Sequence, residues 1–153
     1  MDLTATLDAP CAPHDLFAWV GTLDTYDRWL EIVPRTDPAE PATGDAGPAW
    51  HVTLRGRLGP LARSKRLRMV RTVHDPPTAV TFERRELDGR DHAAWILRGE
   101  VSGGGGDSTL TMHLHYGGSL WVPLLDRLLT SEIESSRDRL RALVAEGPPQ
   151  PAP

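Results

Sequence analysis

Hydrophobic and polar residues alternate along most of the chain, with a period of two that is typical of β-strands. The first such segment is short, and in it Leu3, Ala5 and Leu7 alternate with polar neighbours. Longer alternating segments follow at residues 50–55, 64–74, 80–84, 91–102 and 107–116. Because the large apolar residues of these segments fall on one face, the pattern predicts an antiparallel sheet with an apolar face and a polar face.

Two short helices are predicted between the first strand and the rest of the sheet. Pro13 can occupy the first position of a helix that extends to Val20, because that position needs no backbone N–H donor. After Gly21, four apolar residues repeat at helical spacing before Pro34: Leu23, Tyr26, Trp29 and Leu30. Residues 34–49 contain four prolines and are predicted to form a long loop.

Two tight turns predict how the later strands pair. A two-residue turn at Asp88–Gly89 pairs Phe82 with Trp95 and Val80 with Leu97. A turn at Gly105–Gly106 pairs Trp95 with Tyr116, Leu97 with Leu114, Gly99 with Met112 and Val101 with Leu110. A slip of one residue would scatter the large apolar side chains over both faces, so this register is strongly specified.

The last predicted element is a helix over residues 121–146. Pro123 fits its first turn, and Gly147 followed by Pro148 ends it. Its apolar residues are three or four positions apart and form one stripe: Leu125, Leu128, Leu129, Ile133, Leu140, Leu143 and Val144. The apolar face of the sheet is the only large partner available to bury this stripe. We therefore expect one domain over residues 1–147 and a disordered, proline-rich tail at 148–153.

This order of elements resembles the helix-grip arrangement, and local sequence signals agree with it. The segments that carry the resemblance are Ala9-Pro10 through Trp19-Val20, Tyr26-Asp27-Arg28-Trp29-Leu30, Thr109-Leu110-Thr111-Met112 leading to Tyr116, and Leu125-Asp126-Arg127-Leu128-Leu129. Over residues 2–146 they are similar to the SRPBCC family, which includes START-like proteins, polyketide cyclase/dehydrases and lipid-transport proteins. The resemblance implies an α+β helix-grip fold, in which a curved antiparallel sheet wraps around a long C-terminal helix and encloses a cavity for a hydrophobic ligand. It implies no particular reaction, because one fold hosts many functions.

Composition excludes several other classes of protein. The chain has 153 residues, of which 39% are hydrophobic and 25% charged, as in a soluble globular domain. Its longest apolar run, residues 120–125, is far shorter than the ~20 residues of a transmembrane helix. The first residues lack the basic and apolar regions of a secretory leader. Cys11 is the single cysteine, which rules out an internal disulfide and a four-cysteine metal site. We expect a cytoplasmic protein.

The net charge of −4 is unevenly distributed. Residues 1–54 carry nine acidic and two basic side chains, whereas residues 55–90 carry ten basic and four acidic ones. A segment with this excess of positive charge is compatible with binding to nucleic acid, to an acidic membrane or to another protein. We favour ordinary strand positions, because the arginines alternate with apolar residues, and expect no nucleic acid partner. The sequence does not define the oligomeric state.

His113 and His115 are the strongest candidates for metal ligands, because residues i and i+2 of a strand share a face. In the predicted register that face is the polar one, and Arg98 lies opposite His113, where its guanidinium repels a cation. No third ligand is evident, and we predict no metal and no cofactor. The sequence contains neither a Gly-x-Ser-x-Gly elbow nor a His-Glu-x-x-His motif, so it identifies no catalytic residue.

Polar residues on the apolar face are the candidates for a functional site. Arg71 and Arg84 lie on this face, where a buried unpaired charge is costly. Glu86 and Asp91 beside the predicted turn could pair with them in a structural role. In a functional role, an arginine would anchor a ligand in an otherwise apolar pocket. The predicted ligand-binding residues are Trp50, Met69, Arg71, Phe82, Arg84, Trp95, Leu114 and Tyr116.

Three functions compete at this point. The leading one is binding of a lipid-like or polyketide-like molecule between the sheet and the last helix, because no general base is evident inside. The second is a polyketide cyclase or dehydratase in the same cavity, with an arginine or tyrosine polarising a carbonyl. The third is an interaction through the basic segment 55–90. An enzyme needs a titratable group with a shifted pKa in the cavity, whereas a carrier needs only volume and an entrance.

Overall fold

A computed structural model describes residues 1–58, 61–119 and 122–150. Seven antiparallel strands form one sheet in the order β1-β7-β6-β5-β4-β3-β2. In chain order the elements are β1 (Asp2–Ala9), α1 (Pro13–Val20), the 3-10 helix η1 (Leu23–Arg28), β2 (Arg35–Ala39), β3 (Ala49–Leu58), β4 (Leu61–Asp75), β5 (Ala79–Arg84), β6 (Trp95–Gly104), β7 (Asp107–Tyr116) and α2 (Val122–Glu146). The fold is α+β, as predicted.

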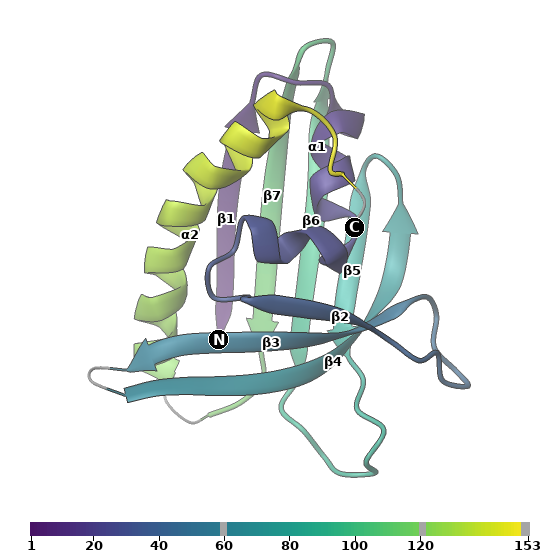
Figure 1. Ribbon diagram of the computed structural model, residues 1–153, viewed down its shortest axis with the longest axis vertical. Helices are drawn as coiled ribbons and strands as arrows, with labels where there is room; N and C mark the ends of the chain where they lie inside the picture. Colours follow the sequence, from purple (N-terminus) through teal and green to yellow (C-terminus); the bar gives the residue numbers. More distant parts are fainter. Residues whose placement is uncertain (59–60, 120–121, 151–153) are drawn as a thin grey trace.

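The sheet is curved, and the helices lie on its concave side (Figure 1). Strands β1, β7 and β6 run side by side, whereas the long strands β3 and β4 cross their lower ends. The helix α2 runs along the edge formed by β1, and α1 and η1 lie in front of β6 and β7. The enclosed side chains form the hydrophobic core.

Hydrogen bonds between side chains and backbone join the two short helices into one unit. The Tyr26 hydroxyl donates to the Val20 carbonyl oxygen at 2.8 Å. The Thr25 hydroxyl donates to the Trp19 carbonyl oxygen at 2.6 Å. Both acceptors belong to the last turn of α1, where carbonyl groups have no partner within the helix. The bonds therefore fix η1, including the buried Tyr26, against α1.

The predicted register of β6 and β7 is confirmed. Trp95 lies opposite Tyr116, Leu97 opposite Leu114, Gly99 opposite Met112, and Val101 opposite Leu110. The chain turns at Gly105, whose φ of 67° lies in the left-handed region that glycine adopts without strain.

The predicted two-residue hairpin at Asp88–Gly89 is wrong. Strand β5 ends at Arg84 and β6 begins at Trp95, so residues 85–94 form a longer loop. Asp88 accepts hydrogen bonds from the Arg90 backbone and from the His92 ring, which stabilise this loop locally. The true pairs are Phe82 with Leu97 and Val80 with Gly99. This register differs from the prediction by two residues, so the predicted faces are retained.

The predicted loop at 34–49 contains an additional strand, β2, which pairs with the start of β3. Pro38 is tolerated in it because β2 is the last strand of the sheet, where a missing backbone N–H breaks no ladder. The rest of this segment is held by Arg68 of β4, whose side chain is only 3% exposed. Arg68 binds Asp45 at 2.7 Å and also the Glu40 carbonyl oxygen at 2.9 Å. The prediction that Arg68 lies on an open polar face is therefore wrong.

The C-terminal helix α2 has the predicted bounds to within one residue, and it ends at Gly147, whose φ is 123°. Two of its arginines bond to the outer edge of β1. Arg137 Nε donates to the Thr6 carbonyl oxygen, and Arg141 Nε donates to the Asp8 carbonyl oxygen, both at 3.0 Å. These carbonyl groups lack a neighbouring strand, so the two arginines satisfy the exposed edge of the sheet.

The end of the chain returns toward α1. The Gly147 carbonyl oxygen accepts from Trp19 Nε1 at 3.1 Å, and the Gln150 carbonyl oxygen accepts from Arg28 at 2.7 Å. Residues 151–153 of the predicted disordered tail lie outside the described residues. Within the described ranges, no helix combines the length and the apolar character needed to span a membrane.

Candidate functional site

A cavity of about 170 Å³ lies between the concave face of the sheet and α2. Its floor is formed by side chains of β1, β3, β4, β6 and β7, and η1 with the residues that follow it closes one side. The remaining side is formed by α2, through Leu129, Ile133, Ser136 and Leu140. These four positions are separated by three or four residues and therefore share one face of the helix. The predicted location of the cavity agrees with this arrangement.

The walls are almost entirely apolar because every contributing strand presents its inward-facing set. On β6 and β7 these are alternate residues, such as Leu97 on β6 and Met112 and Leu114 on β7. The polar neighbours Arg98 and His113 are paired on the opposite face. The period of two that predicted the sheet thus also determines the apolar character of the cavity.

Three of the eight residues predicted to bind a ligand line the cavity: Met69, Trp95 and Leu114. The other three aromatic residues lie in the core next to it. Phe82 is fully buried and packs edge-on against the rings of Tyr26 and Trp50 at 5.9 and 5.8 Å. Trp50 donates from Nε1 to Asp24 at 2.8 Å. Tyr116 packs against Trp95, with ring centroids 4.8 Å apart.

The two arginines predicted as polar anchors do not line the cavity. Arg71 donates to the Gly21 carbonyl oxygen at 2.8 Å, and its guanidinium lies over the Trp50 ring. Partial burial lowers the pKa of Arg71, and nearby Asp24 opposes this effect. Arg71 thus joins β4 to the end of α1, where the chain enters η1.

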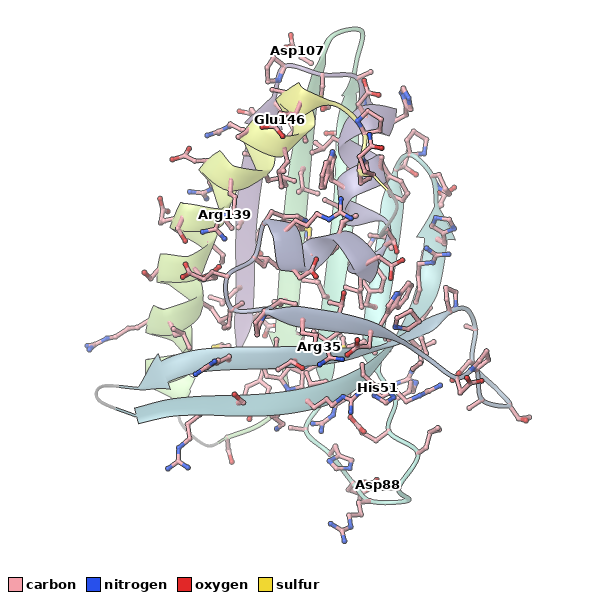
Figure 2. The ribbon with its side chains drawn as sticks, in the orientation of Figure 1. Arg35, His51, Asp88, Asp107, Arg139 and Glu146 are labelled. Carbon is pink, nitrogen blue, oxygen red and sulfur yellow. The ribbon has the colours of Figure 1, made fainter. Side chains whose placement is uncertain are left out.

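Arg84 lies in a separate polar hollow formed with the 85–94 loop. Its side chain is 6% exposed and its Nε binds Glu86 at 3.1 Å. Its terminal nitrogens lie near the Ala93 carbonyl oxygen and the His92 ring. The tip of this loop, marked by Asp88 in Figure 2, points away from α2. The carboxylate partner expected for the structural role is therefore Glu86.

Most polar groups of the cavity wall are already hydrogen-bonded. The Tyr26 hydroxyl donates to the Val20 carbonyl oxygen, and burial raises the pKa of Tyr26, so the phenol stays neutral. Ser136 donates to the Ile133 carbonyl oxygen of its own helix at 3.0 Å. Glu132 accepts from the Glu31 backbone N–H, next to the ion pair of Glu31 with Arg139, which Figure 2 labels on α2.

Two indole nitrogens of the wall are exceptions. Among the described side chains, Trp29 Nε1 and Trp95 Nε1 are the buried nitrogen or oxygen atoms that have no hydrogen-bond partner. Trp29 follows η1 and is 4% exposed, and Trp95 begins β6 and is 7% exposed. The predicted site contained Trp95 but not Trp29, although the helical spacing of Tyr26 and Trp29 already indicated that both face inward.

His113 and His115 lie on the opposite face of the sheet. His113 Nδ1 is 3.0 Å from the Thr4 hydroxyl, and His115 Nδ1 is 2.8 Å from Asp2. Within the part of the chain that the structure describes, histidine, cysteine and carboxylate side chains form no group of three or more that could hold a metal ion.

Comparisons with known proteins agree with this geometry. The family described as polyketide cyclase / dehydrase and lipid transport matches residues 1–145. No curated protein sequence matches the chain. Among solved structures, a START superfamily protein from Mycobacterium smegmatis is 12% identical with a TM-score of 0.71, and the match covers 95% of this chain and 97% of that one.

Two further structures share the fold. A protein from Thermus thermophilus is 15% identical with a TM-score of 0.73, over 95% of this chain and 98% of that one. The di-domain ARO/CYC StfQ from the steffimycin biosynthetic pathway is 13% identical with a TM-score of 0.67, over 95% of this chain and 51% of that one. At these identities the similarity establishes the fold alone.

Proposed function

The chain belongs to the polyketide cyclase / dehydrase and lipid transport family, and from this premise we propose that it binds a hydrophobic small molecule between the sheet and α2. The observation that carries the proposal is the enclosed apolar cavity of about 170 Å³. Apolar cavities of comparable size in proteins stay dry and take up apolar ligands such as benzene. The ligand would replace missing van der Waals contacts without displacing ordered water.

The volume limits the ligand. Pockets for drug-sized molecules measure roughly 300–1,000 Å³, so this cavity of about 170 Å³ accommodates a molecule near the size of one substituted ring. A larger lipid-like or polyketide-like ligand requires α2 to move away from the sheet. The hydrogen bonds of Arg137 and Arg141 with β1 would then have to break.

A polyketide cyclase or dehydratase activity in the same cavity is the second candidate, favoured by the family description and by the similarity to the ARO/CYC structure. Binding is preferred because the titratable groups of the wall already have partners. Glu132 accepts from the Glu31 backbone, Arg137 donates to the Thr6 carbonyl oxygen, and the Tyr26 phenol is held by Val20. A general acid or base needs a proton that it can exchange with the substrate.

The basic segment 55–90 gives weaker support to a nucleic acid or protein partner. Its arginines at 68, 71 and 84 are directed inward, where they bind carboxylates and backbone carbonyl groups. The segment therefore presents fewer free cations than its sequence suggests, and such cations supply most of the affinity of non-specific nucleic acid binding.

Binding of α-methylstyrene, an uncharged single-ring probe, tests the proposal. Burying roughly 200 Å² of probe surface at about 25 cal/mol/Å² gives about 5 kcal/mol, or a dissociation constant on the order of 0.2 mM. Leu97 lines the cavity, so Leu97→Trp should fill it and weaken binding by more than about tenfold. Leu87, which is 65% exposed on the 85–94 loop, provides the matched control Leu87→Trp. Saturable binding that is equal in both variants would place the probe outside the cavity.

Arg84→Leu should separate stability from binding. The guanidinium is buried against Glu86 and the Ala93 carbonyl oxygen, so its loss should cost about 1–3 kcal/mol of unfolding free energy. Because Arg84 does not line the cavity, the affinity for α-methylstyrene should change by less than about twofold. Urea unfolding and an NMR titration of the same variant measure the two quantities. A tenfold loss of affinity with unchanged stability would restore Arg84 as a ligand anchor.

A further inference from the structure

The two unpartnered indole groups belong to opposite walls of one cavity. Trp29 lies at the end of η1, on the side of the helices, and Trp95 lies at the start of β6, in the sheet. Both line the cavity, and both are more than nine-tenths buried. Within the described residues, no other buried side-chain nitrogen or oxygen lacks a partner.

An indole N–H that is buried in a protein usually finds an acceptor. A donor that is desolvated without one costs roughly 1–3 kcal/mol. Two tryptophans elsewhere in the described structure follow this rule: Trp19 donates to the Gly147 carbonyl oxygen, and Trp50 donates to Asp24. The tryptophans that lack acceptors are those at the cavity, where an additional molecule can enter.

The wall also lacks a free charge of either sign among its described side chains. Arg137 bonds to the Thr6 carbonyl oxygen and to Glu134, and Glu132 bonds to the Glu31 backbone. A carboxylate or ammonium group on the ligand would therefore be buried without a partner, which is strongly unfavourable. An uncharged oxygen acceptor would complete an indole N–H at little desolvation cost.

We propose that the ligand is a neutral, largely apolar molecule of about one ring that carries a ketone, ester or ether oxygen, and that Trp29 or Trp95 donates its indole N–H to this oxygen. This inference rests on the proposed function and adds the chemical class of the ligand. It replaces the charged anchor that the sequence suggested with two neutral donors.

Acetophenone and α-methylstyrene form a matched pair of probes, because they have nearly the same shape and differ in a C=O group against a C=CH₂ group. Both are titrated into the wild-type protein, Trp29→Phe and Trp95→Phe. Loss of a neutral hydrogen bond should weaken acetophenone binding roughly 2- to 12-fold in at least one variant. The affinity for α-methylstyrene should change by less than twofold in that variant. Trp19→Phe is the control, because Trp19 already has an acceptor and does not line the cavity.

A second measurement uses the wild-type protein and does not depend on the folding of a variant. The indole N–H resonance of Trp29 or Trp95 should shift downfield on saturation with acetophenone but not with α-methylstyrene. Equal effects of the substitutions on both probes, or indole resonances that respond identically to both, would overturn the inference while leaving cavity binding intact. Failure of both probes to bind the wild-type protein would instead overturn the proposed function.

Discussion

Replacing Arg68 by methionine is expected to lower the free energy of unfolding by about 3–5 kcal/mol, the range measured when one partner of a buried ion pair is removed. The side chains of Arg68 and Asp45 are 3% and 9% exposed, and their closest atoms are 2.7 Å apart. Arg68 also donates to the backbone carbonyl oxygens of Glu40 and Arg85. The substitution leaves the Asp45 carboxylate and two carbonyl groups without this donor, and it detaches the segment before β3 from the sheet.

Urea unfolding of Arg68→Met measures this loss, and Arg98→Met is its matched control. Arg98 forms an ion pair with Glu100 at 2.6 Å, but both side chains are about half exposed, so its loss should cost no more than about 1 kcal/mol. The double variant Arg68→Met/Asp45→Leu should recover much of the stability, because no buried charge then remains unpaired. Equal, small effects of Arg68→Met and Arg98→Met would contradict a structural role for the buried pair.

The same ion pair predicts an acid-dependent loss of stability. The hydrogen bond from Arg68 lowers the pKa of Asp45 from its ordinary value near 3.8. A carboxyl group whose folded pKa is lowered stabilises the protein fully above its unfolded pKa, and this contribution is lost as the pH falls through the folded pKa. Wild-type stability should therefore fall more steeply below about pH 4 than that of Arg68→Met, in which the pKa of Asp45 is no longer lowered.

Hydrophobic periodicity predicted the elements of the fold well, because it reports which face of each element is buried. The pairing of Trp95 with Tyr116 and of Leu97 with Leu114 followed from one glycine turn and the alternation of apolar residues. The apolar stripe of the last helix likewise had one large partner, the concave face of the sheet. Both features depend on local patterns that a single sequence displays directly.

The errors arose where polar side chains form contacts between distant parts of the chain. The 85–94 loop is held by Asp88 with His92 and by Arg84 with Glu86, contacts that compete with a two-residue turn. Arg68 reaches Asp45, which lies 23 residues earlier in the chain. Periodicity placed this arginine on a solvated face, and it contains no information about the segment that covers that face.

The candidate site was predicted in its location but not in its polar groups. Met69, Trp95 and Leu114 follow from the strand registers, and they line the cavity. Arg71 lies among apolar residues in the strand pattern, but its partner is the Gly21 carbonyl oxygen, which is 50 residues away in sequence. The missing partners of Trp29 and Trp95 could not be predicted, because a sequence does not show which donors remain without an acceptor after packing.

Replacing Phe82 by alanine is expected to cost about 3–5 kcal/mol of unfolding free energy, as for other fully buried phenylalanines. The Phe82 side chain has no exposed surface, and its ring packs edge-on between Tyr26 and Trp50. Such aromatic pairs contribute roughly 0.5–1.5 kcal/mol beyond the area they bury. The substitution therefore removes apolar contacts, two favourable ring geometries and the support beneath η1.

The position of Phe82 makes this measurement informative about the cavity. Had β5 and β6 paired through a two-residue turn, Phe82 would lie opposite Trp95 in the cavity wall, with one side already free of contacts. Its truncation would then remove fewer contacts and cost well under about 3 kcal/mol. In the observed register Phe82 pairs with Leu97 and is closed off by Tyr26 and Trp50, so the full cost applies. Leu87→Ala, at a side chain 65% exposed on the neighbouring loop, should change stability by no more than about 0.5 kcal/mol in the same urea experiment.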